Sequence, residues 1–128
     1  MGVIYASTLR TTRMTDVQTA IDAGAAAGFI EIGTAAMASV LATITLADPC
    51  GSVSGDVLTF TMPKSDTSAD NTGTAAAARI KDSDGNIVVS GLTVGTSGTN
   101  VVLDSTSITS GQTVTLSSAT LTHNTSGT

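Results

Sequence analysis

The chain has 128 residues, a formal net charge of −5 and only five Lys and Arg residues, which excludes the clustered basic surface that nucleic-acid binding requires. Its length is typical of one domain. Its aromatic residues are Tyr5, Phe29 and Phe60, so aliphatic side chains and Thr must build the core, and we expect neighbouring molecules to help stabilise it. Ser and Thr occupy 39 positions, and Thr favours strands over helices.

The first predicted element is a short helix at about residues 14–24, followed in the same domain by β-structure up to residue 128. Thr15 and Gln18 have the spacing of a capping box, although a start near Thr11 is also compatible with the sequence. So short a helix is unstable alone, and we expect it to dock on the sheet or on another subunit. One helical stripe is approximated by Leu9, Met14, Val17 and Ile21.

After residue 28, apolar residues recur at every second position, which predicts strands. Turn signals at residues 51–55, 65–73, 82–86, 95–98 and 110–111 separate these runs. The alternation breaks at Ser117 and Ser118, which indicates a β-bulge. We therefore predict a mainly β fold: an antiparallel β-sandwich or barrel-like body of seven to eight strands, with one short N-terminal helix.

The stretch from Asp82 to Asn86 could begin a calcium-binding loop or form a hairpin turn. A calcium loop that starts at Asp82 needs Gly where Ile87 stands and a bidentate Glu where Thr93 stands. Asp84 and Gly85 between two strand patterns instead favour a type I′ hairpin turn, which needs positive φ at both central residues. We predict the turn, and no metal site.

The sequence indicates neither catalysis nor a cofactor. Cys50 stands alone in loop-like sequence and is expected to be a small structural residue, and His123 lies near the C-terminus without a nucleophile motif. The uncharged segment at residues 32–47 is shorter than the roughly 20 residues of a membrane-spanning helix, and the N-terminus lacks the pattern of a signal peptide. We expect no enzyme activity, no small-molecule substrate and no membrane partner.

Two segments are candidates for contact with a protein partner. Residues 1–13 form a predicted N-terminal arm that is too apolar for a free tail, and its candidate contact residues are Val3, Ile4, Tyr5, Leu9, Arg10 and Arg13. The loop at residues 64–73 is long enough to be a contact element, with Asp66, Asp70 and Asn71 as candidates. The same three side chains could instead only order the loop, by accepting hydrogen bonds from nearby backbone N–H groups.

Four segments of the chain resemble a family of small virion structural proteins of tailed bacteriophages. They read AIDAGAAAGFIEI, VLATITLADPCGSVSGDVLTFTM, DTSADNTGTAAAARIKDSDGNIVVSGLTVG and LDSTSITSGQTVTLSSATLTH. The resemblance covers most of residues 10–123 and lies in composition and turns. This chain has Ala75 to Ala78 where relatives commonly carry an aromatic residue, which leaves a thinner core.

The resemblance implies a capsid decoration or cement subunit that is made in the host cytoplasm and binds the virion head. Its implied partners are the major capsid protein and other copies of the chain, with a trimer compatible with local threefold symmetry. The alternative is a neck, tail or fibre-associated β-sandwich that binds a receptor or carbohydrate. Sugar sites usually offer an aromatic face, and this chain has a single Tyr and no Trp.

Overall fold

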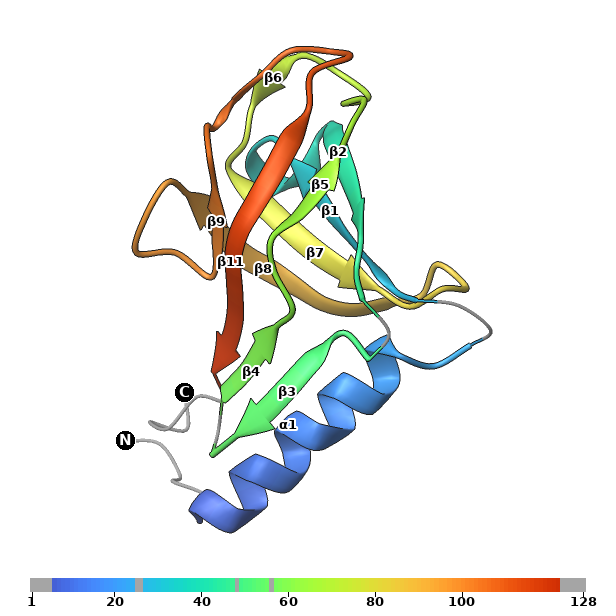
Figure 1. Ribbon diagram of the computed structural model, residues 1–128, viewed down its shortest axis with the longest axis vertical. Helices are drawn as coiled ribbons and strands as arrows, with labels where there is room; N and C mark the ends of the chain where they lie inside the picture. The colour runs from blue at the N-terminus through green and yellow to red at the C-terminus, as the bar shows by residue number, and fades with distance from the viewer. Residues whose placement is uncertain (1–5, 25–26, 48, 56, 123–128) are drawn as a thin grey trace.

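The computed structural model describes residues 6–24, 27–47, 49–55 and 57–122. The prediction of a mainly β fold with one N-terminal α-helix is confirmed. Strands form the upper part of the molecule, and the helix α1 (Ser7–Ile21) lies at its lower end beside the strand β3 (Gly51–Ser54) (Figure 1). Among the described residues, no helix is long and apolar enough to cross a membrane.

The predicted helix boundaries at residues 14–24 are wrong, because α1 begins at Ser7 and ends at Ile21. Residues 7–13 thus belong to the helix rather than to a separate arm. Thr15 does not cap the helix: its hydroxyl donates to the carbonyl oxygen of Thr11, 3.0 Å away within the helix. Thr12 and Thr19 bond in the same way to carbonyls four residues earlier, so these hydroxyls have partners inside a helix that Thr ordinarily disfavours.

Eleven strands lie in the described part of the chain, more than the seven to eight predicted, because short strands also form at residues 51–54, 64–66, 73–74 and 107–108, outside the predicted strand segments. The remaining strands are β1 (Phe29–Gly33), β2 (Val40–Thr45), β4 (Val57–Phe60), β5 (Lys64–Asp66), β6 (Gly73–Thr74), β7 (Ala77–Lys81), β8 (Ile87–Gly95), β9 (Val101–Leu103), β10 (Ser107–Ile108) and β11 (Val114–Thr122).

Nine strands join in one curled sheet with the order β2-β1-β7-β8-β9-β11-β4-β3, and β5 pairs with β11 off this path. Strands β10 and β6 form a separate two-stranded sheet. Strand β5 also lies against β2, so the first strand of the path returns through β5 toward β11. The curled sheet therefore closes into the barrel-like body that the sequence predicts (Figure 1).

The structure confirms one predicted detail of the sheet and corrects another. The bulge predicted at Ser117 and Ser118 is confirmed, since the register between β11 and β9 shifts between Leu116 and Ser118. The prediction that all strands are antiparallel is wrong for one pair, because β8 and β9 run parallel from Val94 opposite Val101. Asn100 holds the loop between them: its side-chain oxygen accepts hydrogen bonds from the backbone N–H and the hydroxyl of Thr93.

Two of the predicted turns contain strands. Residues 51–54 form β3, which pairs with β4, and the segment 65–73 includes most of β5 and the first residue of β6. Glycine, serine and aspartate suggested turns there, but the partner strands offer these segments backbone hydrogen bonds that local sequence cannot reveal. The connection between β1 and β2 adopts a left-handed backbone where the sequence contains no turn signal. Ala36 and Met37 there both have a φ of 57°, although neither is Gly or Asn.

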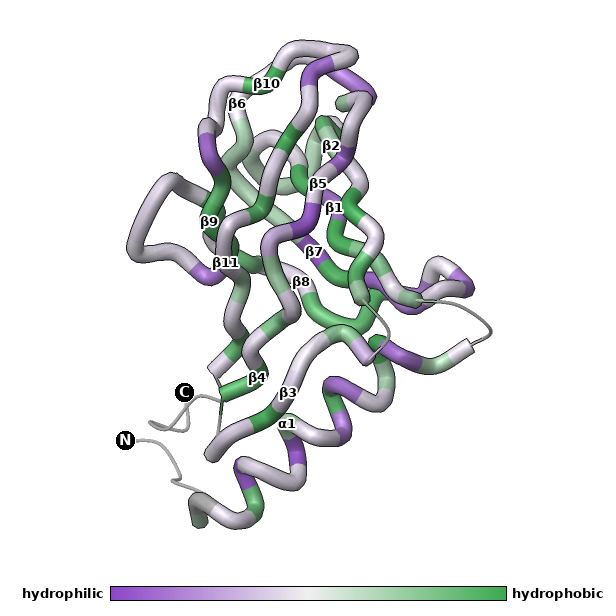
Figure 2. Tube along the Cα trace, viewed as in Figure 1, coloured by the Kyte–Doolittle hydropathy of each residue, from purple (hydrophilic) through white to green (hydrophobic). Residues whose placement is uncertain are grey.

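The core consists mainly of branched aliphatic side chains and Ala, with Phe60 as its one buried aromatic among the described residues. The whole chain exposes 6255 Å², close to the roughly 6,200 Å² expected of a monomeric protein of this mass. Figure 2 shows hydrophobic positions along the strands and hydrophilic ones in the connecting loops and on α1. The largest fully buried side chains are those of Ile21, Ile30, Ile32, Leu41, Ile44, Leu58, Ile80, Leu103, Ile108, Leu116, Val101 and Val114.

Candidate partner-binding surface

The predicted contact residues of the arm divide between α1 and the segment outside the described residues. Val3, Ile4 and Tyr5 lie outside the described residues. Leu9 lies in the first turns of α1, and 45% of its surface is exposed, so it does not belong to the buried stripe in which the sequence placed it. Arg10, half-buried, and Arg13, exposed, follow on the same helix. Contact of these residues with a partner stays a prediction.

The predicted contact residues of the loop 64–73 bond to the edge of β2. Asp66 accepts a hydrogen bond from the backbone N–H of Thr43 at 3.1 Å. The backbone N–H of Asp70 donates to the carbonyl of Leu41 at 2.7 Å, and the side-chain amide of Asn71 donates to the carbonyl of Val40 at 2.8 Å. We call this set of contacts the β2 latch. It covers a strand edge that would otherwise offer unpaired backbone groups to other chains.

The helix is fastened at the start of β3 by two polar side chains. Gln18 donates from its side-chain amide to the carbonyl of Gly51 at 2.8 Å, and Asp22 accepts the backbone N–H of Cys50 at 2.9 Å. The exit of the helix packs on the turn at residues 82–86, where the hydroxyl of Ser83 donates to the carbonyl of Ala23. Gly24, at a φ of +100°, has no room for a Cβ atom there because Ser83 Oγ occupies the place.

An apolar groove remains between α1 and the sheet, with a volume of about 280 Å³. Its apolar lining consists of Met14 and Val17 from α1, Val89 and Leu92 from β8, and Leu121 from β11. The polar atoms on its wall come from Asn100 and Thr122, so no charged side chain lines it. The helix thus covers the end of the barrel incompletely.

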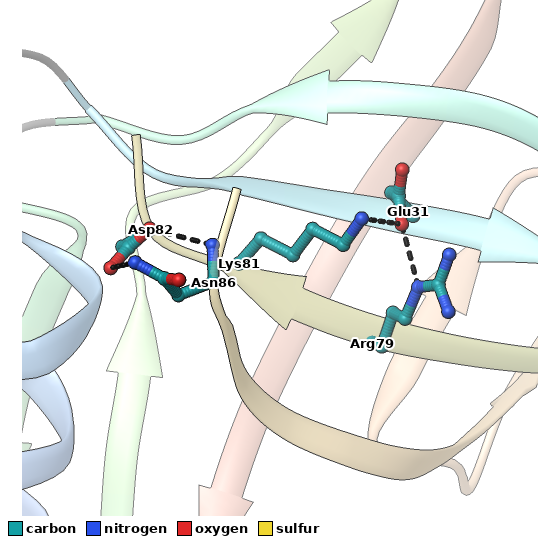
Figure 3. A network of polar contacts seen from close by, with 5 residues as sticks. All are labelled: Glu31, Arg79, Lys81, Asp82 and Asn86. Atoms are coloured by element: carbon teal, nitrogen blue, oxygen red, sulfur yellow. Dashed lines mark hydrogen bonds and ion pairs between the residues drawn. The ribbon is translucent and has the colours of Figure 1, made fainter. Parts of the chain in front are cut away.

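The outer face of β1 and β7 carries a compact charge cluster (Figure 3). Glu31, the one Glu of the chain, contacts Arg79 Nε at 2.6 Å and Lys81 Nζ at 3.1 Å through the same carboxylate oxygen. Burial raises the pKa of Glu31, but the hydrogen bonds and charges of Arg79 and Lys81 outweigh burial and bring the net pKa below its ordinary value. The cluster ties β1 to β7, and one carboxylate partners both cations, which leaves the three side chains with a net positive charge.

The stretch from Asp82 to Asn86 is the predicted hairpin turn between β7 and β8, but it is not of type I′. Gly85 has a φ of +90°, whereas Asp84 is not among the residues with positive φ. Gly85 N–H donates to the Asp82 carbonyl and Asp82 N–H to the Asn86 carbonyl, as in a three-residue loop that ends in a left-handed residue. The turn therefore needs its glycine at one position only.

The carboxylate of Asp82 organises this turn rather than offering an open metal ligand. It accepts hydrogen bonds from the backbone N–H and the side-chain amide of Asn86 (Figure 3). It also accepts one from the backbone N–H of Asp84. The backbone and side-chain hydrogen bonds of Asn86, with those from Asp84 and Gly85, lower the pKa of Asp82 against the opposing effect of burial. Among the described residues, no group of three or more His, Cys, Asp or Glu could hold a metal ion.

The two residues considered for nucleophilic chemistry give no site in the described chain. Cys50 is fully buried, as expected of a structural thiol, and its backbone joins α1 to β3. His123 lies outside the described residues.

Comparisons with known proteins identify no relative of the chain. No family model matches it, and no curated protein or solved structure matches it significantly.

Sequence reasoning missed both the β2 latch and the groove. It identified Asp66, Asp70 and Asn71 but not the strand they cover, because residues 40–43 lie more than 20 positions away. It placed Met14 and Val17 on an apolar stripe, which was the available signal for the helical wall of the groove. The opposite wall comes from β8 and β11, and no local pattern distinguishes Val89 or Leu121 from ordinary core residues.

Proposed function

We propose that the chain is a structural subunit of a tailed-bacteriophage virion, a decoration or cement protein that binds the head and stabilises it. In this proposal it has no catalytic role and needs no cofactor. It contacts the major capsid protein and other copies of itself. The proposal begins from the sequence resemblance to small virion structural proteins.

The observation that carries the proposal is that other parts of the chain bond to both end strands of the sheet path, β2 and β3. The β2 latch occupies one end of the sheet path, and α1 lies along β3 at the other, bonded through Gln18 and Asp22. A subunit present in many copies on a particle is exposed to edge-to-edge association with its neighbours. Covered edges restrict association to defined surfaces, which suits a subunit that must bind an ordered lattice.

The alternative proposal is a binding module at the neck, tail or fibre of the same kind of particle. The closed body would suit that role equally, and location distinguishes the two.

Immunogold electron microscopy on intact virions of the phage that encodes the chain tests the location. Label spread over the head supports the decoration role. Label confined to the neck, tail or fibres contradicts it and supports the alternative. Absence of label from particles that bind a control antibody to the major capsid protein would refute both.

A further inference from the structure

We propose that the outer face of β1 and β7 in one copy of the chain binds acidic loops of a second copy. The first surface, here called the basic face, consists of Phe29, Glu31, Arg79, Lys81 and Ile87. The second surface, here called the end loops, consists of residues 66–72 and 104–112. This inference rests on the proposed function, in which copies of the chain associate, and it names the two surfaces that meet.

The register of the sheet brings the members of the basic face together. Arg79 lies opposite Glu31, and Lys81 lies opposite Phe29 on one side and Ile87 on the other. Residues opposite each other in a ladder project to the same face of the sheet. The alternate residues of β1 and β7 are buried, so this face points away from the core, and Ile87 on it is 55% exposed.

Arg79 has hydrogen-bond donors to spare. Its Nε contacts Glu31 at 2.6 Å, whereas its two terminal nitrogens have no partner in the described part of the chain (Figure 3). Glu31 also pairs with Lys81 at 3.1 Å, so one carboxylate serves two cations and a net positive charge remains. The terminal nitrogens of a guanidinium form a fork of donors that fits a carboxylate, so the basic face can bind a second one.

The two acidic residues of the next turn have other neighbours. Figure 3 shows the ammonium of Lys81 directed toward Glu31 and away from Asp82. The carboxylate of Asp82 accepts hydrogen bonds from the turn itself. The carboxylate of Asp84 lies at the exit of α1, 3.5 Å from the place that a Cβ atom on Gly24 would take. The basic face is therefore a local positive site on a chain whose net charge is −5.

The end loops form one continuous surface at the upper end of the molecule (Figure 1). The backbone N–H of Ala69 donates to the carbonyl of Gln112 at 2.9 Å, and that of Gly111 donates to the carbonyl of Ala69 at 2.8 Å. The backbone N–H of Ser110 donates to the hydroxyl of Thr72 at 2.9 Å. The two loops therefore hold each other in place.

The end loops carry carboxylates that lack internal partners. They contain Asp66, Asp70 and Asp104 and no Lys, Arg or His. Both oxygens of Asp66 accept backbone N–H groups. Asp70 and Asp104 are exposed, and their carboxylates make no hydrogen bond or ion pair within the described ranges. These carboxylates have the charge and the acceptor geometry that the fork of Arg79 requires.

Charge favours the end loops of a second copy over the terminal segments of the same chain. Residues 1–5 and 123–128 contain no Asp or Glu, so neither segment has an acidic side chain for Arg79. Every copy, in contrast, presents the end loops. Because the two surfaces differ, the contact is heterologous, and copies that use it join head to tail into rings or open chains.

Sedimentation velocity of the purified full chain tests the inference. We would measure it from about 10 μM to about 1 mM, the range of Kd expected of a small interface. We expect the sedimentation coefficient to rise above that of the monomer as the concentration increases.

Two basic residues provide a matched pair of variants. Arg79→Gln and Lys64→Gln each remove one positive charge, but Lys64 lies on β5, outside the basic face. We expect Arg79→Gln to weaken association at least about tenfold and Lys64→Gln to leave it within about threefold. Far-ultraviolet circular dichroism checks that both variants fold. If Arg79→Gln does not fold, the double variant Asp70→Asn with Asp104→Asn must cause the same loss.

Mixing the variants tests the head-to-tail arrangement. The Arg79→Gln chain keeps intact end loops, and the chain with Asp70→Asn and Asp104→Asn keeps an intact basic face. We expect neither variant to associate alone. An equimolar mixture should form a dimer and nothing larger, because one intact pair of surfaces remains.

Three results would overturn the inference: a monomer at every concentration up to about 1 mM, equal effects of Arg79→Gln and Lys64→Gln, or a mixture of the two disabled variants that stays monomeric. None of these results involves the particle. Failure of the head-to-tail contact therefore leaves the immunogold test of the proposed function intact.

Discussion

The two end strands of the sheet path, β2 and β3, are covered by different kinds of contact. At β2, polar groups of residues 66–71 bond to the backbone N–H of Thr43 and to the carbonyls of Leu41 and Val40. At β3, a helix is fastened by Gln18 and Asp22, but its apolar side covers the barrel incompletely and leaves the groove. A few hydrogen bonds from the same chain are enough to pair backbone groups at a strand edge. Apolar side chains are fully packed only when other side chains cover their whole surface. The helical end is therefore the less completely packed of the two.

The largest expected effect comes from the apolar contact at the helical end. Ile21 on α1 is fully buried, and Ile21→Ala should lower the free energy of unfolding by about 2–5 kcal/mol, since it removes packed methylene groups and leaves a cavity. Urea denaturation followed by circular dichroism measures the change. The control Leu9→Ala lies on the same helix at an exposed position and should change the free energy by less than about 0.5 kcal/mol. Equal effects of the two variants would mean that α1 is not docked on the sheet through Ile21.

A smaller effect is expected at the β2 latch. Asp66→Ala removes the acceptor for the backbone N–H groups of Thr43 and Ser68 and should cost about 1–3 kcal/mol, because these donors lose their partner. Asp70→Ala is the matched control in the same loop, since Asp70 joins the latch through its backbone N–H rather than its side chain. We expect it to cost less than about 0.5 kcal/mol in the same denaturation assay. If Asp70→Ala were the more damaging change, the assignment of the latch to the Asp66 carboxylate would be wrong.

The smallest expected effect is the pH dependence of stability that comes from the charge cluster on β1 and β7. This cluster lies on neither of the two end strands, β2 and β3. The pKa of Glu31 is lowered in the folded protein from an ordinary value of 4.5, so the carboxylate contributes stability above pH 4.5 and loses it as pH falls through the folded pKa. The stability difference between the native chain and Glu31→Gln should therefore be constant near neutral pH and shrink on acidification. Denaturation curves between neutral pH and about pH 3 measure it.

Salt provides the control for this prediction. In about 1 M NaCl the Debye length falls to about 3 Å, and the contribution of the ion pairs to the difference should decrease. A stability difference that grows on acidification would contradict the predicted sign.

Features of the fold that depend only on neighbouring residues could be predicted from the amino-acid sequence. Alternation after residue 28 predicted a β body, the interruption at Ser117 and Ser118 predicted the bulge, and Asp84 with Gly85 predicted a hairpin. Each signal acts over a few residues, because side-chain direction in a strand and φ in a turn are local properties. The same reasoning failed where a distant partner intervened, as in residues 51–54, which become a strand because β4 lies beside them.

How the sheet is closed, and where it stays open, depends on contacts between segments that are distant in the sequence. In the sequence, Asp66 belongs to a polar loop, and no local signal indicates Thr43, 23 residues earlier, as its partner. In the structure, the backbone nitrogen of Thr43 lies 3.1 Å from a carboxylate oxygen of Asp66. Helix α1 could start at Ser7 because Met14, Val17 and Ile21 have a sheet to pack on, which compensates for its weak intrinsic helix propensity. The groove exists only because α1, β8 and β11 meet there. Local sequence encodes the elements, but the surfaces between them follow from contacts across the whole chain.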